Sequence, residues 1–224
     1  MKNLNTYINE KLTIVHKKSY SCAPQIKEDL RDIIKDRLTD DPNADLNDID
    51  VSRITDMSGL FWDLDPHNID ISDWDLSNTK DTRFMFSECT NFNSDLSDWD
   101  VSNVTNMSYM FEGCTNFDSD LSDWDVSKVE NMRGLFNCCE KFTSNLSKWD
   151  VSKVEDMSYM FNGCTKFNSD LSGWNVKRVE NTKFMFFNCV NFDSDLSNWD
   201  LRQVKECTFM FTKCEKLKKH PKFS

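Results

Sequence analysis

Glycine, proline and long apolar runs are scarce in this sequence. It holds 5 glycines and 4 prolines in 224 residues, which excludes a flexible linker and a glycine-rich phosphate-binding loop. No stretch approaches the ~20 apolar residues that a membrane span needs. The N-terminus offers no apolar run for a secretory signal, and Cys22 lacks the run that precedes the cysteine of a bacterial lipoprotein signal. We therefore expect no membrane insertion and, by default, a cytoplasmic protein.

Positive charge is also in deficit. Lys and Arg number 27 against 38 Asp and Glu, which gives a formal net charge of −11. Nucleic acid and anionic membrane surfaces are polyanions, so this charge argues against either as the principal partner. A protein partner, basic if charge contributes to binding, fits the composition better.

Histidine is rare as well. The three histidines lie outside the repeat, with no paired nucleophile or metal ligand: His16, His67 and His220. We therefore expect no enzyme activity and no cofactor.

What the sequence has in abundance is repetition, with a step of 25 residues. Chance does not keep several rows of residues in phase over this length, so a repeat architecture is predicted. The rows expected to form the core are Trp74, Trp99, Trp124, Trp149, Trp174 and Trp199; Phe86, Phe111, Phe136, Phe161, Phe186 and Phe211; and Cys89, Cys114, Cys139, Cys164, Cys189 and Cys214.

Within one repeat the apolar spacing changes. Leu96, Trp99 and Val101 follow the spacing L-x-x-L-x-L, whose last positions alternate as on a half-buried strand. From Val104 to Cys114 apolar residues recur at steps of three and four, which predicts one face of a short helix. The sequence Ser127-Lys128-Val129-Glu130 reads as a capping box at the start of such a helix. Stacking of these repeats would place each Trp over the next and fill the interior with aromatic layers.

The ends depart from the repeat. Residues 1–40 are predicted to form an N-terminal cap, in which Ile26, Leu30, Ile33, Ile34 and Leu38 mark an amphipathic helix and residues 7–15 add a strand. Residues 41–217 hold about seven repeats, and residues 218–224 form a basic tail. The last strand is expected to keep a free edge that this tail shields.

The unit Trp-Asp-Val-Ser-Asn-Val-Thr-Asn-Met-Ser-Tyr-Met-Phe-Glu-Gly-Cys-Thr-Asn-Phe, residues 99–117, resembles the BspA-like leucine-rich repeat family, in its Mycoplasma-type surface-protein branch. The resemblance covers roughly residues 41–217. It implies attachment to proteins or host surfaces, and a surface or virion location. Together the pattern and the resemblance predict an α/β repeat solenoid: a leucine-rich-repeat-like right-handed coil with a parallel sheet on one side, short helices on the other and an α-containing N-terminal cap.

The nine cysteines are interpreted as free thiols. Six lie in one row of the predicted helices, and helices ~8–10 Å apart exceed the ~7 Å between Cα atoms that a disulfide spans. Buried thiols acting as small apolar residues are expected. No C-x-x-C pair and no repeated His supports a zinc site.

Acidic residues supply the candidate binding face. Asp118, Asp120, Asp123 and Asp125 resemble oxygen ligands for calcium, but later repeats break the pattern, and turn-forming Asp that bonds its own backbone explains it more simply. Two outward rows beside the Trp row are either a surface that recognises a partner or an ordinary solvated face. The candidate residues are Asp73, Asp75, Asp98, Asp100, Asp123, Asp125, Lys148, Asp150 and Asn198.

A further row holds Phe84, Tyr109, Tyr159, Phe184 and Phe209. Packing between neighbouring helices is its expected role, and an exposed aromatic stripe for a partner is the alternative.

The function predicted from these observations is a non-catalytic scaffold that binds a protein through its outward strand face. Two alternatives stay open at this point: a surface adhesin or virion-surface protein exported without a recognisable signal, and a structural spacer.

Overall fold

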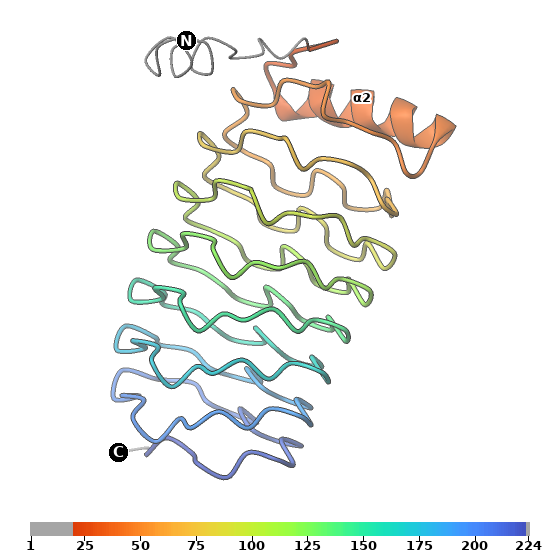
Figure 1. Cartoon of the computed structure of the whole chain (residues 1–224). Helices are drawn as coiled ribbons and strands as arrows, with labels where there is room; N and C mark the ends of the chain where they lie inside the picture. Colours follow the sequence, from red (N-terminus) through yellow and green to blue (C-terminus); the bar gives the residue numbers. More distant parts are fainter. Residues whose placement is uncertain (1–19, 223–224) are drawn as a thin grey trace, which may run out of the picture.

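The chain winds into a stack of coils. The computed structural model describes residues 20–222, and Figure 1 shows the coils following one another from the N-terminal end to the C-terminal end, with helix α2 (Lys27–Asp40) lying across the first of them. Equivalent residues of neighbouring coils are 25 apart, as in the stacked pairs Trp74–Trp99 and Phe86–Phe111. The predicted 25-residue repeat is therefore the structural unit.

Helix α2 is the predicted N-terminal helix. Leu30 and Ile34 are fully buried on its inner face, with Ile33 and Leu38 partly buried beside them. Ile26, at the N-cap, is 51% exposed and makes no side-chain cap bond. The predicted strand at residues 7–15 lies outside the described residues.

The predicted strands, sheet and repeat helices are wrong. Among residues 20–222, α2 is the only helix, and the bridges between coils are isolated single pairs that form no sheet. Each coil is instead a series of tight turns, in which an N–H donates to the carbonyl three residues back: Trp99 to Leu96, Val104 to Val101, and Met110 to Met107. The two ends of such a turn both face the interior, so a chain of turns shows the three-residue apolar spacing that we read as a helix. An α/β, leucine-rich-repeat-like coil is therefore not the architecture of this chain.

The predicted capping box is also wrong. The Ser127 N–H donates to Oδ1 of Asp125 at 3.0 Å, and the Glu130 N–H donates to the Thr105 carbonyl of the preceding coil at 2.9 Å. Asp and Asn side chains that accept from the backbone two residues on stabilise a turn in competition with a helix. The Asp that precedes each Val-Ser pair therefore decides the local structure.

Backbone hydrogen bonds join the coils along the segment that we had predicted to be helical. N–H groups of Met107, Tyr109, Phe111 and Gly113 donate to carbonyls of the next coil, at residues 131, 133, 135 and 137, over 2.7–3.0 Å. Residues 96–101, the predicted strand, make no backbone–backbone bond to a neighbouring coil. The ladder repeats down the stack, with parallel bridges from Asp56 to Glu206.

Two positions in every coil have a left-handed backbone, which makes both a helix and a strand impossible there. In one coil these are Tyr109, at φ 57°, and Gly113, at φ 71°. Side chains other than Gly rarely adopt this region, at a cost of roughly 1–2 kcal/mol each. The two sets are Gly59, Phe84, Tyr109, Gly134, Tyr159, Phe184 and Phe209, and Asp63, Glu88, Gly113, Cys138, Gly163, Asn188 and Lys213.

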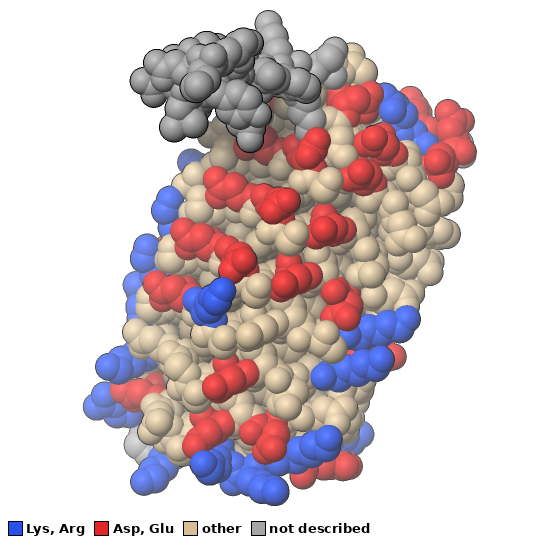
Figure 2. All heavy atoms as spheres, in the orientation of Figure 1, with Lys and Arg blue, Asp and Glu red and all other residues tan. Residues whose placement is uncertain are grey.

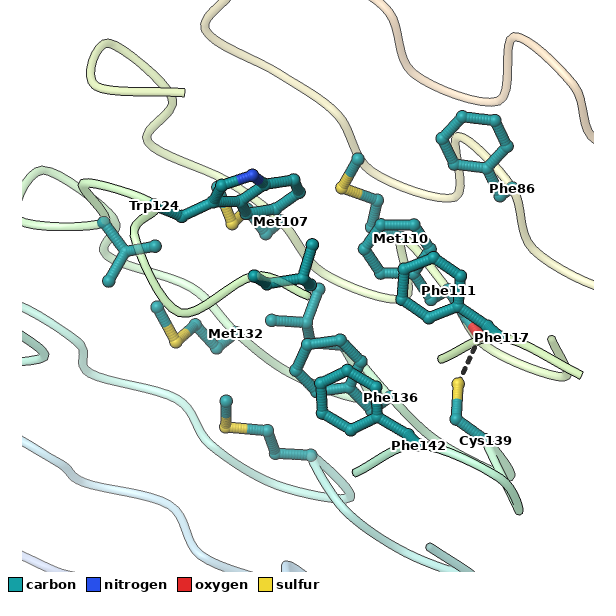
Figure 3. Packing of buried hydrophobic residues seen from close by; sticks show 14 of the residues in the cluster. Phe86, Met107, Met110, Phe111, Phe117, Trp124, Met132, Phe136, Cys139 and Phe142 are labelled. Carbon is teal, nitrogen blue, oxygen red and sulfur yellow. Dashed lines mark hydrogen bonds between the residues drawn. The ribbon is translucent and has the colours of Figure 1, made fainter. Parts of the chain in front are cut away.

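The interior consists of stacked aromatic columns. Each of the six repeat Trp residues is 3–4% exposed, and Trp74, Trp99 and Trp124 stack at centroid distances of 6.5 Å with rings within 5° of parallel. Figure 3 shows Phe111 and Phe136 in a second column, with Phe117 and Phe142 beside them. The predicted stacking of each Trp over the next is present in the pairs from Trp74 to Trp124, and again between Trp174 and Trp199 at 6.3 Å.

Two side-chain bonds repeat between coils. The Trp124 Nε1–H donates to the Leu96 carbonyl at 2.9 Å, 28 residues back, and the Cys139 thiol donates to the Phe111 carbonyl, also 28 residues back and at 2.9 Å (Figure 3). Every Trp from Trp74 to Trp199 and every Cys of the repeated row makes the equivalent bond. All nine cysteines are free thiols, and burial raises the pKa of Cys89 to about 12. Cys214 and Phe211, in the last coil, are only partly buried.

The two ends of the ladder differ. At the N-terminal end Arg31 of α2 donates to the carbonyls of Gly59, Leu60 and Trp62, each at 2.6 Å. At the other end the N–H groups of residues 207, 209, 211 and 213 have no hydrogen-bond partner within residues 20–222. The free edge thus consists of the last rung of the ladder and not of a strand near Trp199.

Surface charge changes along the stack. Residues 41–125 hold 20 Asp and Glu against 3 Lys and Arg, whereas residues 126–224 hold 12 against 16. Figure 2 shows acidic side chains over much of one face and basic ones gathered at its C-terminal end. Within residues 20–222 the helix is too short and too polar to cross a membrane.

Candidate binding surfaces

The nine residues predicted to form the binding face are all exposed. They sit at two positions of the coil, one on either side of the buried Trp: Asp98 and Asp100 flank Trp99, for example. Turn geometry produces this arrangement, because the Trp N–H closes a turn on Leu96 and points the indole inward. We call the six carboxylates of the earlier coils the acidic surface: Asp73, Asp75, Asp98, Asp100, Asp123 and Asp125.

Half of the acidic surface also has a structural role. Oδ1 of Asp75, Asp100 and Asp125 accepts the N–H two residues ahead at 2.9–3.0 Å, and Asp150 does the same. Hydrogen bonds from the hydroxyl and N–H of Ser102 lower the pKa of Asp100, whereas the neighbouring charge of Asp125 raises it. The pKa of Asp100 is lowered overall, so this carboxylate stays ionised beside Asp125 although the two charges repel each other.

The other half of the surface has more varied contacts. The Asp73 N–H donates to Oδ1 of Asn47, in the preceding coil, at 2.9 Å. Asp123 forms an ion pair with Lys148 of the next coil at 3.0 Å. Lys148 therefore marks the end of the acidic surface, and Asn198, further along, carries no charge.

The residues considered as calcium ligands are engaged in turns and in bonds between coils. Asp118 accepts from the N–H and hydroxyl of Thr143 at 2.8 and 2.7 Å, and Asp120 accepts from the Ser122 N–H at 3.0 Å. They border an open hollow of about 390 Å³ together with Lys148. Within the described part of the chain, no three His, Cys, Asp or Glu side chains are grouped so that they could hold a metal ion.

The aromatic row forms a column on the outside of the stack, which we call the aromatic column: Phe84, Tyr109, Tyr159, Phe184 and Phe209. Residues 20–222 contain no repeat helices between which these side chains could pack, so that expectation is wrong. Phe84 stacks on Tyr109 at 5.0 Å, and Tyr159 on Phe184 at 5.1 Å. Phe84 and Phe209 are 41% and 55% exposed. The sequence signal that we missed is glycine at the same position in two coils, which indicates a left-handed backbone.

Arg133 completes the column where glycine interrupts it. Its guanidinium lies 5.7 Å from the ring centroids of both Tyr109 and Tyr159, and its Nε–H donates to the Tyr109 hydroxyl at 2.6 Å. The hydrogen bond raises the pKa of Arg133. A cation between two aromatic faces gains roughly 0.5–1 kcal/mol per contact at an exposed site.

The two histidines of the described residues lie apart from these surfaces. His67 is exposed, and His220 packs edge-on against Phe211 at 5.2 Å. His16 lies outside the described residues.

A protein-family model matches the chain twice, over residues 29–133 and 117–223. Its description is "Mycoplasma protein of unknown function, DUF285". The chain belongs to this family. The two matches cover the coils and most of α2, and they identify the coils as a Mycoplasma-type repeat. The predicted membership of the BspA-like leucine-rich repeat family is not confirmed. No curated protein matches the chain significantly, and no solved structure does.

Proposed function

We propose that this chain is a non-catalytic repeat scaffold that binds a basic protein partner through the acidic surface. The observation that carries the proposal is the concentration of exposed carboxylates on neighbouring coils, over a part of the chain with 20 acidic and 3 basic residues. A surface potential of this kind attracts cationic groups and raises their rate of association.

Rigidity supports the same function. Oδ1 of Asp75, Asp100 and Asp125 is fixed by backbone hydrogen bonds, and each backbone is held by buried columns below it. A binding group that is already ordered loses less conformational entropy when a partner binds.

Electrostatic repulsion gives a further reason. Hydrogen bonds from Ser102 lower the pKa of Asp100 overall, and the nearby charge of Asp125 opposes this effect, so the two carboxylates repel each other in the free protein. Lys or Arg side chains of a partner would offset this repulsion. Lys148 provides an example within the chain, since it pairs with Asp123 across neighbouring coils.

The test removes charge without changing the turns. Asp75→Asn, Asp100→Asn and Asp125→Asn keep an oxygen at the Oδ1 position, as Asn175 does in its own coil. The probe is a 12-residue peptide of alternating Lys and Ser, and its affinity is measured in about 50 mM salt, where screening is weak. We expect wild type to bind the peptide, and the triple variant to bind it at least fivefold more weakly.

The matched control removes three charges elsewhere: Glu130→Gln, Glu155→Gln and Glu180→Gln, all exposed at another position of the coil. This variant should lose less than twofold. Equal losses in the two variants would show that net charge, not this surface, governs binding, and would refute the proposal. So would a wild-type protein that does not distinguish the Lys peptide from its Glu counterpart.

A further inference from the structure

The aromatic column has a regular spacing. Phe84–Tyr109 and Tyr159–Phe184 stack at 5.0 and 5.1 Å, with ring planes 9° and 13° apart. The same position of the coil holds glycine at residues 59 and 134. Two places in the column therefore lack a ring, and they can be compared.

The place at Gly134 is filled from within the chain. A Cβ atom added at Gly134 would lie 2.3 Å from Cδ1 of Tyr109, because the Tyr109 ring lies over the glycine. The Arg133 guanidinium completes the filling between Tyr109 and Tyr159. Glycine is required there because a neighbouring ring occupies its side-chain space.

The place at Gly59 is filled by no side chain of residues 20–222. A Cβ atom added there meets only Cβ of Trp62, at 4.0 Å. It opens into a hollow of about 330 Å³ lined by Ser58, Gly59, Trp62, Arg83 and Phe84. Trp62 and Phe84 are 51% and 41% exposed, so two large apolar side chains face solvent at one point. Clustered exposed aromatics on a soluble protein mark an interaction site.

The polar groups around the hollow already have partners. The Arg83 guanidinium pairs with Asp81 at 2.7 Å, and the Ser58 hydroxyl accepts a hydrogen bond from Nζ of Lys27 at 2.9 Å. A sugar needs several hydrogen-bonding groups to orient it. The hollow offers chiefly ring faces, which favour another flat apolar ring.

We propose that this hollow binds an aromatic side chain presented by a protein partner. The ring would stack on the face of Phe84 that points toward Gly59, at the spacing of about 5 Å that the column itself shows, with Trp62 beside it. A single ring that stacks at one open site makes few contacts, so an isolated aromatic group should bind in about the millimolar range. The hollow and the acidic surface share no residue, so this inference stands independently of the proposed function.

The test uses the Trp62 indole as a reporter. The other six indole N–H groups each donate to a buried backbone carbonyl, so Trp62 gives the one exposed signal among seven. The ¹⁵N-labelled protein is titrated with N-acetyl-L-tyrosinamide, and in parallel with N-acetyl-L-leucinamide and N-acetylglucosamine. We expect a saturable shift of the Trp62 signal with the tyrosine amide alone, while the six buried signals stay in place.

Two variants locate the site. Gly59→Tyr supplies the missing ring, and this position already holds Tyr at residues 109 and 159 with the same left-handed backbone. The variant should fold, keep the six buried signals and lose the response at least tenfold. Gly173→Ala, whose added Cβ meets nothing within 4 Å, is the control and should respond like wild type.

Three results would overturn the inference: no saturable shift in wild type, equal shifts with the leucine amide or the sugar, or an unchanged response in Gly59→Tyr. None of these bears on the Lys-peptide experiment, which involves other residues. Loss of peptide binding in the triple Asn variant would likewise leave the Trp62 titration unaffected.

Discussion

Replacing Trp124 by alanine tests whether the aromatic columns hold the stack together. Trp124 is 4% exposed, and its ring lies 6.5 Å from that of Trp99 and 6.3 Å from that of Phe111. Trp-to-Ala changes in a core cost about 3–5 kcal/mol, and the lost hydrogen bond to Leu96 adds about 1 kcal/mol. We therefore expect the free energy of unfolding to fall by about 4–6 kcal/mol.

A second substitution separates the two contributions. Trp124→Phe keeps a ring in the column but removes the Nε1–H bond of 2.9 Å to Leu96, so it should cost about 1–2 kcal/mol. Trp62→Ala, which removes the same side chain from an exposed site, should cost less than about 1 kcal/mol.

Urea unfolding followed by near-ultraviolet circular dichroism measures all three free energies. The reasoning is wrong if Trp124→Ala costs under about 2 kcal/mol, or no more than Trp62→Ala. Because each coil contacts only its neighbours, a break in an interior coil weakens the interfaces on both sides of it.

Three further predictions follow from the backbone and the thiols. Cys138→Gly should raise the free energy of unfolding by about 0.5–1 kcal/mol, because Cys138 is exposed at φ 61°, where the next coil has Gly163; a lower urea midpoint would contradict this. Arg31→Ala should lower the free energy of unfolding by about 2–4 kcal/mol, because three backbone carbonyls lose their hydrogen-bond donor. Arg31→Lys should restore little of this loss, because an ammonium lacks the planar fork of donors. A full rescue by lysine in thermal unfolding would contradict the reasoning. Burial raises the pKa of Cys89 to about 12 and that of Cys214 to about 11, from an ordinary 9.0. Both thiols therefore stabilise the fold fully below pH 9, and this stabilisation is lost as the pH rises toward 12. Urea midpoints measured from about pH 8 to 11 should fall less steeply in Cys89→Ala than in wild type.

The sequence predicted which side chains fill the interior of each coil, but not the backbone conformation of the coil. The 25-residue step shows which residues lie over one another, and the apolar face of α2 is evident from Leu30 and Ile34. The spacing of Val104, Met107 and Met110 predicts a helix wrongly, because apolar spacing alone does not distinguish a helical turn from successive tight turns. Asp100, two residues before a Ser N–H, carried the information that favours turns.

The candidate surfaces were predictable to different degrees. Alternation about Trp99 predicted that Asp98 and Asp100 would face outward, as they do. The aromatic column does not lie between helices as expected, because aromatic character alone does not reveal the backbone conformation at these positions. Gly59 and Gly134, in register with Tyr109, were the evidence for a left-handed position.

The one-way ladder has a consequence for how such a chain can change in length. Every interior coil donates its ladder N–H groups, such as those of Met107 and Tyr109, to the coil ahead and accepts those of the coil behind. One further N–H, that of Glu130 in its coil, donates to the coil behind. The same pattern recurs from coil to coil, so all interior coils are interchangeable in their bonding. A duplication or loss of 25 residues would leave each hydrogen bond and ring stack with an equivalent partner. An insertion of one residue would shift the Trp, Phe and Cys columns out of register together. Variation by whole coils is therefore the change that this architecture tolerates, and α2 with Arg31 is the part that cannot be duplicated in the interior without breaking the ladder.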